Sequence, residues 1–426
     1  MKRYLTGIDW IINSLDYTGK AQSGIGNHSE LILELKGSPS AAAIQEALNN
    51  FNRAFPILNG FPSRALNLCP YWKIPSGKKT VPIRLHYIKV NASQDHLAPL
   101  SALVNSAFQS KREHLIFTLV EAGQRSFLGM AFDHRLLDAK GAEAFLHLFQ
   151  QFYQNHTPLQ ISLACPPHLN KWIQKLLAGR QVNRFLLNLT KQSPRTLPLD
   201  TKNEPSRFRV IHLDPAQTER LTRQAYEQAG YLMFMPYLLA KSIQIMHRVF
   251  TQKNIEGANY LIPVPMDIRN KEEAHQDALF NHFSFFVFKI DAAKVDDLDW
   301  LLNQIKSQVY EQVKNKMPEA IINASFLMRI ASLPLTNFFL RLMSKKNFAS
   351  FSFSYLNNSY QQNMFMQARV QNIFHLPRTP KPPGIGIYFN QFDNKLNITL
   401  SYFDDLLSDE QADQIAKGLE ALGNEE

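Results

Sequence analysis

Cysteine is nearly absent from this chain of 426 residues, in which only Cys69 and Cys165 occur and no CxxC pair is found. A disulfide framework and a cysteine-based zinc site are therefore not indicated, and we expect no metal site. No apolar run is long enough to span a bilayer. The apolar stretch near the N-terminus is interrupted by Asp9, Asn13 and Asp16, unlike a signal peptide. We therefore expect a cytoplasmic protein.

Several catalytic and nucleic-acid signatures are missing as well. The chain has no GxSxG elbow, no HExxH pair and no Walker loop, and Gly384-Ile385-Gly386 precedes a strand pattern instead of a helix. The formal net charge is +10, but the basic residues are scattered and form no arginine-rich run or basic–aromatic ladder. We therefore expect no nucleic-acid partner. A basic surface suits coenzyme A phosphates, an acidic carrier protein or an anionic membrane surface equally well.

The residues that are present indicate a folded protein of two subdomains. Hydrophobic residues make up 45% of the chain and aromatic residues 11%, as in globular proteins, and the length exceeds that of one core. Proline-rich sequence surrounds a basic amphipathic stretch, KWIQKLLAGRQVNRFLLNLTK. We therefore expect an N-terminal subdomain at residues 1–165, a linker with a helix at 166–205 and a C-terminal subdomain at 206–426. The linker helix either packs between the subdomains or touches a membrane or a partner.

A polar turn at residues 133–138 is the most informative part of the chain. A strand pattern ends there and an amphipathic helix begins at once. His134 lies in this turn, and a histidine in such a place can exchange protons near neutral pH. Asp138, four residues further on, either caps the helix or binds a partner from elsewhere in the chain. The alternative is a capped helix beside a surface histidine.

This turn also resembles a known family. His134-Arg135-Leu136-Leu137-Asp138 matches the HxxxD core of the condensation-domain-like acyltransferases, which include chloramphenicol acetyltransferase, condensation domains and wax ester synthases. Gly141 and a helix follow, as in that superfamily. Many members carry HHxxxDG, whereas this chain has Asp133 in place of the first histidine and Ala139 in place of the glycine. Asp133 should favour the charged imidazolium form of its neighbour.

The resemblance implies an α/β (α+β) fold of two chloramphenicol-acetyltransferase-like subdomains, each a mixed sheet flanked by helices, with an active-site tunnel between them. It also implies a salt bridge between Asp138 and Arg269, which ends the strand-like LIPVPMDIRN. Such a bridge would hold the His134 turn in shape.

Further site residues follow from the resemblance. Asn281 in NHFS corresponds to an asparagine that lines the cleft, with Phe280 in place of the family's glycine; strand-entry capping is the alternative. FSFSYLNNSY resembles the superfamily's serine–asparagine element, with Tyr355 where asparagine is usual. We expect the hydroxyl of Ser354 or Tyr355 to donate a hydrogen bond to the oxyanion.

The resemblance implies transfer of an acyl group from a coenzyme A or carrier-protein thioester to an alcohol or amine, with His134 as general base. No permanently bound cofactor is expected, because the acyl-CoA or phosphopantetheinyl acyl carrier is a co-substrate. We also expect the protein to be a monomer. Two alternatives stay open. One is a wax ester or diacylglycerol synthase-like O-acyltransferase, indicated by Trp72 in PYWK and by apolar segments, although a buried structural tryptophan explains PYWK as well. The other is a non-catalytic binding module.

Overall fold

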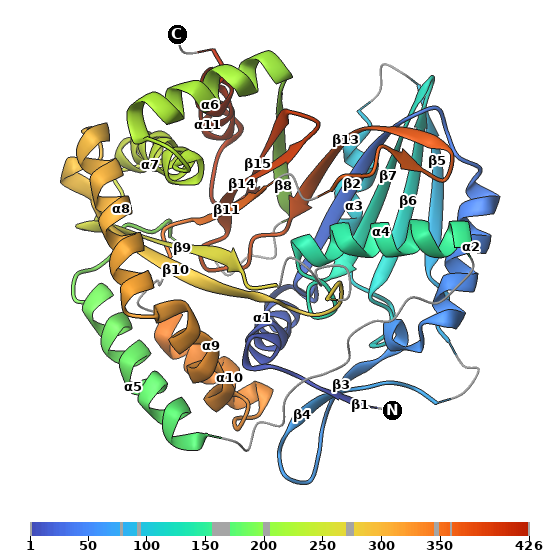
Figure 1. The fold of residues 1–426 in the computed structure, drawn as a ribbon, viewed down its shortest axis with the longest axis horizontal. Helices are drawn as coiled ribbons and strands as arrows, with labels where there is room; N and C mark the ends of the chain where they lie inside the picture. Colours follow the sequence, from blue (N-terminus) through green and yellow to red (C-terminus); the bar gives the residue numbers. More distant parts are fainter. Residues whose placement is uncertain are drawn as a thin grey trace.

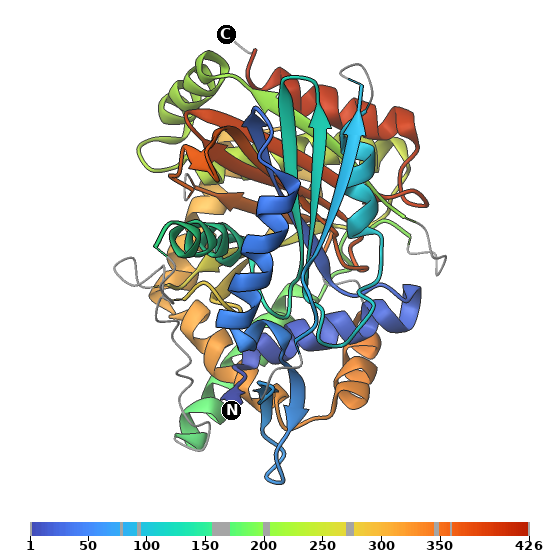
Figure 2. The same cartoon turned by 90° about the vertical axis from the view of Figure 1, so that its right-hand side faces the viewer.

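The chain folds into two halves that lie side by side, each built on its own β-sheet (Figure 1). The structure is a computed structural model that describes residues 2–76, 80–91, 95–155, 171–198, 205–269, 277–344, 349–357 and 360–424, with side chains of 339–344 left out. The ends of the expected linker, at 166–170 and 199–204, therefore lie outside the described residues. Figure 2 shows the same arrangement from the side.

A six-stranded sheet forms the centre of the first half. Its strands in spatial order are β12 (Met364–Phe365), β13 (Ala368–Pro377), β2 (His28–Lys36), β7 (Arg125–Asp133), β6 (Leu115–Ala122) and β5 (Arg84–Val90). Alternate residues of β2 enter opposite cores, because successive strand side chains point to opposite faces. Leu31 and Leu33 pack beneath α2 (Ala41–Ala54) and α4 (Ala139–Asn155), whereas Ile32 packs beneath α3 (Leu97–Val104).

The second half contains a four-stranded and a two-stranded sheet. The strands are β11 (Ser352–Leu356), β14 (Ile385–Phe392), β15 (Lys395–Phe403) and β8 (Ser206–Leu213) in one sheet, and β9 (Asn259–Asp267) with β10 (Phe283–Asp291) in the other. The helices on the outer side are α6 (Pro215–Ala229), α7 (Phe234–Gln252), α8 (Leu298–Lys314) and α11 (Asp409–Ala421). Their buried side chains share one apolar core with the sheets, as expected for a helix layer covering a sheet face.

One strand crosses from the second half of the sequence into the first half of the fold. β13 is hydrogen-bonded to β2 in the first sheet, although its residues lie within the expected C-terminal subdomain. Side chains of the second sheet hold its other side: Asn390 Nδ2 donates to the Ile373 carbonyl at 2.7 Å and Thr399 Oγ1 to the His375 carbonyl at 2.8 Å. The boundary near residues 166–205 therefore does not divide the sheets between the halves.

A helix that the sequence analysis did not anticipate lies where the halves meet. α1 (Gly7–Ser23) begins with a capping box, in which Thr6 and Asp9 each bind the other's backbone N–H. A small sheet beside it is formed by β1 (Lys2–Tyr4), β4 (Pro70–Lys73) and β3 (Phe61–Arg64). Short 3₁₀ helices lie elsewhere in the chain, at Pro56–Asn59 and Ala292–Lys294. α1 packs on α9 (Met317–Met328) and α10 (Leu333–Ser344) of the second half, and so connects both halves.

The expected linker helix is present as α5 (Trp172–Leu189), and it packs on α9 along the outside of the molecule. The apolar stretch at residues 234–246 forms most of α7, whose inward side chains are buried. Within the described ranges, no helix is both long enough and apolar enough to cross a membrane.

Candidate active site

The sequence predicts a strand, a turn and a helix around His134, and the structure contains them as β7, residues 134–138 and α4. The turn is closed by backbone hydrogen bonds from Leu136 and Leu137 to the Asp133 carbonyl, at 2.9 and 3.2 Å. The His134 N–H donates to the Asn27 carbonyl at 3.0 Å. The histidine therefore lies on a backbone that is fixed on both sides, at the end of a central strand.

Asp138 both caps α4 and binds a partner from the second half. Its Oδ1 accepts from the Gly141 N–H and from Arg269 Nη2, each at 2.7 Å, and its Oδ2 accepts from the His282 N–H at 2.8 Å. The expected ion pair is therefore present, with both side chains buried. Burial alone would raise the pKa of Asp138, but the Arg269 charge and these hydrogen bonds hold it below its usual value.

The guanidinium of Arg269 is held on three sides. Besides Asp138, it donates from Nη1 to Asp267 Oδ1 at 3.0 Å and from Nε to the Asp277 carbonyl at 3.0 Å. Lys140 Nζ lies 3.1 Å from the other oxygen of Asp267, so a second ion pair joins the same two elements. The start of α4 and the end of β9 are thus fixed to each other.

Gly141 allows this close approach. A Cβ atom at this position would lie 2.5 Å from the Ala278 carbonyl oxygen and 3.2 Å from Arg269 Nη2. Any side chain would therefore push the segment before β10 away from α4.

The His134 ring has one nitrogen engaged and one nitrogen open. Nδ1 lies 3.1 Å from Oδ1 of Asn281. The amide of Asn281 is oriented by its own Nδ2, which donates to the His134 carbonyl at 3.1 Å and faces Asp9 Oδ1 at 3.4 Å. Because Nδ2 faces two acceptors, Oδ1 is the atom that faces the ring, and Nδ1 carries the proton. In the neutral ring Nε2 then carries the lone pair, and among the described residues it has no hydrogen-bond partner.

Asp9 supports this asparagine from α1. Its Oδ1 accepts from the Asn281 N–H at 3.1 Å, while its Oδ2 accepts from the Thr6 N–H at 2.8 Å and Arg3 Nη1 at 3.0 Å. Burial alone would raise the pKa of Asp9, but the Arg3 charge and the hydrogen bonds lower it. An ionised Asp9 therefore fixes the asparagine that fixes the ring.

Phe280 stands where the resemblance leads us to expect a glycine, and its backbone has the conformation that glycine favours, with a φ of 72°. Its ring is buried between the Arg3 guanidinium, 3.6 Å from the ring centroid, and the ring of Trp72, 5.6 Å away. These contacts hold the segment before β10 in place despite the side chain.

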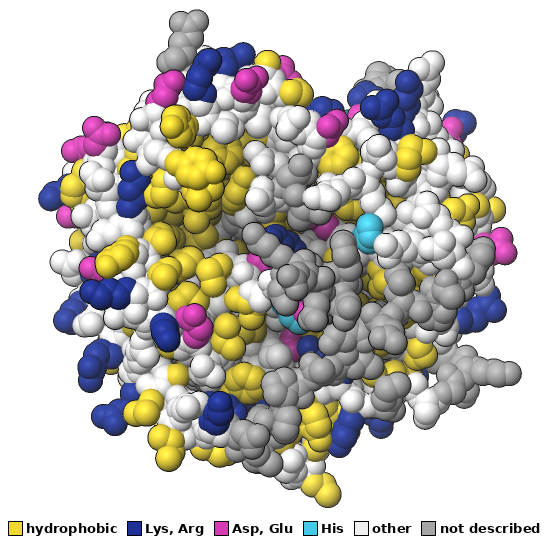
Figure 3. Space-filling model, in the orientation of Figure 1, with side chains coloured by type: hydrophobic (Ala, Val, Ile, Leu, Met, Phe, Trp, Pro, Cys, Tyr) yellow, Lys and Arg dark blue, Asp and Glu magenta, His cyan; other side chains and the backbone are white. Residues whose placement is uncertain are grey.

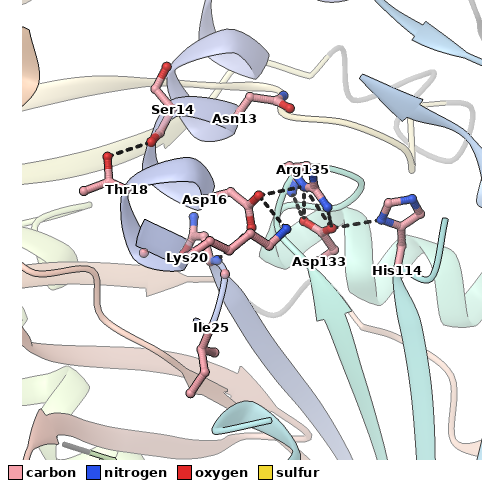
Figure 4. A network of polar contacts seen from close by, with 12 residues as sticks. Asn13, Ser14, Asp16, Thr18, Lys20, Ile25, His114, Asp133 and Arg135 are labelled. Atoms are coloured by element: carbon pink, nitrogen blue, oxygen red, sulfur yellow. Dashed lines mark hydrogen bonds and ion pairs between the residues drawn. The ribbon is translucent and has the colours of Figure 1, made fainter. Parts of the chain in front are cut away.

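Asp133 takes part in a different network (Figure 4). Its carboxylate accepts from Arg135 Nε at 2.9 Å and lies 2.9 Å from Nδ1 of His114, while Nε2 of His114 lies 2.7 Å from the Gly60 carbonyl. Both ring nitrogens of His114 therefore face oxygen atoms of other residues. Burial alone would raise the pKa of Asp133, but Arg135 and His114 hold it well below its usual value.

The structure therefore corrects the expectation that Asp133 acts on the adjacent His134. Consecutive residues at a strand end point to opposite faces, so the carboxylate turns away from that ring. The Asp133 network continues to α1, because Arg135 Nε lies 3.3 Å from Asp16 Oδ2, and Lys20 Nζ lies 2.8 Å from the same oxygen. Asp133 thus fixes the turn to α1.

Ser354 and Tyr355 point to opposite faces of the second sheet. Ser354 pairs with Tyr388, whose hydroxyl hydrogen-bonds Thr379 at 2.8 Å on the polar face toward the first half. Tyr355 packs on Phe234 and donates to Gln391 Oε1 at 3.1 Å, on the face of the sheet that packs against the core of the second half. The structure therefore does not bring Tyr355 to the His134 turn.

Gln391 and Phe234 also line a separate pocket. This pocket has a volume of about 840 Å³ and lies between α6, the loop after α6 and the turn that joins β14 to β15. Figure 3 shows the apolar hollow on this face of the second half.

Sequence reasoning did not find Asp9 or Arg3, which complete the support of His134. The signal that was available is the Thr6-to-Asp9 spacing of a capping box, which predicts a helix start at residue 7. The contact of Asp9 with Asn281 joins residues 272 positions apart and leaves no trace in the local pattern.

Solved structures with the same fold support the assignment of the architecture. The chain matches the TRI3 trichothecene 15-O-acetyltransferase from Fusarium sporotrichioides with a TM-score of 0.72 and 10% identity, covering 99% of this chain and 95% of that one. It matches the first condensation domain of the CDA synthetase with a TM-score of 0.69 and 12% identity, covering 100% and 97%. It also matches an epimerization domain of tyrocidine synthetase B with a TM-score of 0.62 and 15% identity, covering 100% and 96%.

No protein-family model matches the sequence, and no curated protein matches it. The structural matches show that the chain has the condensation-domain fold of two chloramphenicol-acetyltransferase-like halves. Because an acetyltransferase, a condensation domain and an epimerization domain share this fold, the reaction has to be argued from the site.

Proposed function

We propose that this chain, with its condensation-domain fold, is an acyltransferase that uses His134 as general base. The observation that carries the proposal is the geometry of the His134 ring: Nδ1 lies 3.1 Å from Asn281 Oδ1, and Nε2 has no hydrogen-bond partner among the described residues. A general base needs a lone pair that can reach the substrate and a ring held in one orientation.

The proposed reaction takes an acyl thioester and an alcohol or amine. His134 Nε2 removes the proton from the acceptor as its oxygen or nitrogen attacks the thioester carbonyl carbon. The carbon–sulfur bond then breaks, and the leaving thiolate takes the proton back from the imidazolium. No bond forms between the acyl group and the protein. Asn281 keeps the reactive tautomer in place throughout.

Asp138 and Arg269 are assigned a supporting role in this proposal. Both side chains are buried and bind each other, backbone groups and Asp267, so they hold the turn without meeting the substrate. Ser354 is proposed as a donor to the oxyanion, because its strand presents it on the polar face toward the first half. Tyr355 is not proposed for this role, because its hydroxyl is bound to Gln391.

The donor is proposed to be acyl-coenzyme A or an acyl carrier protein, both of which carry negative charge complementary to a chain of net charge +10. The acceptor is proposed to be an alcohol or an amine. Trp72 offers no separate support for a wax ester synthase, because it is fully buried and its Nε1 donates to the Ile57 carbonyl at 2.9 Å, as a structural tryptophan does.

Release of free thiol tests the proposal and separates an enzyme from a non-catalytic binding module. The purified chain is mixed with acyl-coenzyme A or acyl carrier protein donors of short, medium and long chain, each with and without an alcohol or an amine. Thiol release is followed with a chromogenic reagent. We expect acceptor-dependent thiol release with at least one pair, together with the ester or amide by mass spectrometry. A donor that binds and is recovered intact, with both coenzyme A and carrier-protein thioesters, would instead identify a binding module.

A further inference from the structure

Helix α5 presents a second apolar face that nothing in the described structure covers. Ile173, Leu176, Leu177 and Leu187 are 74%, 54%, 57% and 58% exposed, and their spacing places them on one side of the helix. The opposite side of α5 is already used, because Ala178, Val182 and Phe185 pack on α9. The outer leucines are therefore not needed to hold the helix in place.

Basic residues lie among these apolar side chains. Arg180 and Arg184 fall between Leu177 and Leu187 on the same side and are exposed, and Lys191 follows just beyond the helix. The sequence contains no aspartate or glutamate from residue 144 to residue 199. The outer face of α5 thus carries both apolar and positively charged side chains, and residues 144–199 contain no acidic side chain that would neutralise this charge.

Other exposed apolar residues lie at the same end of the molecule. The β3–β4 hairpin carries Leu66, fully exposed at its tip, and α10 carries Leu335 and Phe338, which are 46% and 59% exposed. Figures 1 and 2 both place α5, α10 and this hairpin at the end that carries the N-terminus. In Figure 3 hydrophobic and basic side chains alternate along the lower left edge, where α5 lies.

We propose that this end of the molecule, with the outer face of α5 at its centre, docks onto the surface of an anionic lipid membrane. A lipid headgroup layer accepts both parts of the face at once: arginines meet phosphates, and leucines enter the boundary of the acyl chains. Contributions from three separate segments at one end fit a flat partner better than a groove-bound peptide. Trp172, at the start of α5 and 36% exposed, has the amphipathic side chain that favours this interface.

Sedimentation with lipid vesicles tests the proposal. Wild-type protein is mixed with vesicles of phosphatidylcholine alone or with about one third phosphatidylglycerol, at low and high salt. We expect binding to the anionic vesicles that weakens at high salt, because exposed charges are screened within about 8–10 Å. Leu177→Glu should weaken this binding about tenfold or more, because the burial of one leucine is lost and the new negative charge is repelled by the anionic lipid.

Tyr226→Glu is the matched control. Tyr226 is 61% exposed on α6, at the opposite end of the molecule, and the substitution changes the charge by the same amount. It should bind vesicles like the wild type, and both variants should keep the wild-type circular dichroism spectrum and melting temperature. Equal vesicle binding by Leu177→Glu, or no binding by the wild type, would overturn the proposal. The proposal would also be overturned if the wild type does not bind vesicles and Leu177→Glu instead abolishes self-association or the binding of an acidic carrier protein.

Discussion

At the scale of single residues, the account depends on which nitrogen of His134 carries the proton. Asn281 decides this, because its amide is oriented by the His134 carbonyl and by Asp9. The sequence indicated that Asn281 lies in the cleft but not that it binds the histidine. The role of Asn281 in the structure is therefore to position the His134 ring, and this role does not require Asn281 to contact the substrate.

Replacing Asn281 should change the pH dependence of turnover as well as its size. In Asn281→Ala the ring is free to flip, and we expect the maximal rate to fall by about tenfold or more. In Asn281→Asp a carboxylate would face Nδ1 and favour the imidazolium, so the acidic limb of the pH–rate profile should move to higher pH. Asn52→Ala is the control, because this buried amide is bonded to Asn59 and the Val81 carbonyl, away from His134. Profiles of identical shape in Asn281→Asp and wild type would contradict the role.

A second residue-scale prediction concerns His28, which is buried beside the Asp133 network. Burial, helped by the charges of Lys20, Arg135 and Arg378, lowers the pKa of His28 to about 3. Below pH 6.5, the ordinary pKa of histidine, the ring of His28 is therefore protonated in the unfolded chain but neutral in the folded protein. The contribution of His28 to stability is fully present above pH 6.5 and is lost as the pH falls toward 3.

The measurement is the free energy of unfolding in denaturant at several pH values. Between pH 6.5 and 5 we expect His28→Gln to lose stability less steeply than wild type, by up to about 1.4 kcal/mol per pH unit. Parallel curves for the two proteins over this interval would show that His28 does not stay neutral on folding.

At the scale of elements, the junction of β7 and α4 requires a glycine at position 141. Gly141→Ala should lower the free energy of unfolding by about 1–3 kcal/mol, because the new Cβ meets the rigid Ala278 carbonyl. Gly418→Ala in α11 is the matched control: its nearest neighbours are side-chain carbons of Ile245 at 3.3 Å or more, and helix propensity favours alanine by about 0.5–1 kcal/mol. The free energies of unfolding of both variants are measured by chemical denaturation. If Gly141→Ala is as stable as Gly418→Ala, the segment before β10 can move aside without an energetic cost.

Local pattern predicted the elements that are periodic in their own sequence, namely the helix after the turn at 133–138 and the linker helix. The ion pair of Asp138 with Arg269 was implied by the family resemblance and not by local pattern. α1 was not expected, because buried polar residues such as Asp9 and Asp16 interrupt its apolar periodicity. Strand alternation could have shown that Ser354 and Tyr355 cannot face the same side.

At the scale of the whole molecule, the sequence indicated two halves but not how they are joined. β13 pairs with β2 across more than three hundred residues, and no local pattern specifies such a partner. The ion pair of Asp138 with Arg269 is another of these long-range connections, and it lies next to the proposed base.

This ion pair should contribute to the stability of the whole molecule. Asp138→Asn and Arg269→Gln should each cost about 3–5 kcal/mol of unfolding free energy. Arg269→Gln leaves the buried Asp138 carboxylate without a cation, and Asp138→Asn leaves the buried guanidinium with only the more exposed Asp267. The double variant should cost clearly less than the sum of the two. Unchanged melting temperatures in both single variants, or strict additivity in the double variant, would show that the pair does not join the halves in solution.

The central claim is that His134 removes the acceptor proton in an acyl transfer. The most direct test is the turnover of His134→Ala, measured as acceptor-dependent thiol release with the donor and acceptor that the wild type prefers. His247→Ala is the control, because this partly buried ring in the second half also holds its Nδ1 in a hydrogen bond, 2.9 Å from the Tyr260 hydroxyl. The account predicts that His134→Ala keeps the wild-type melting temperature and loses roughly 10² to 10⁴-fold in kcat, whereas His247→Ala keeps most of its activity. A folded His134→Ala protein that turns over at the wild-type rate would contradict it.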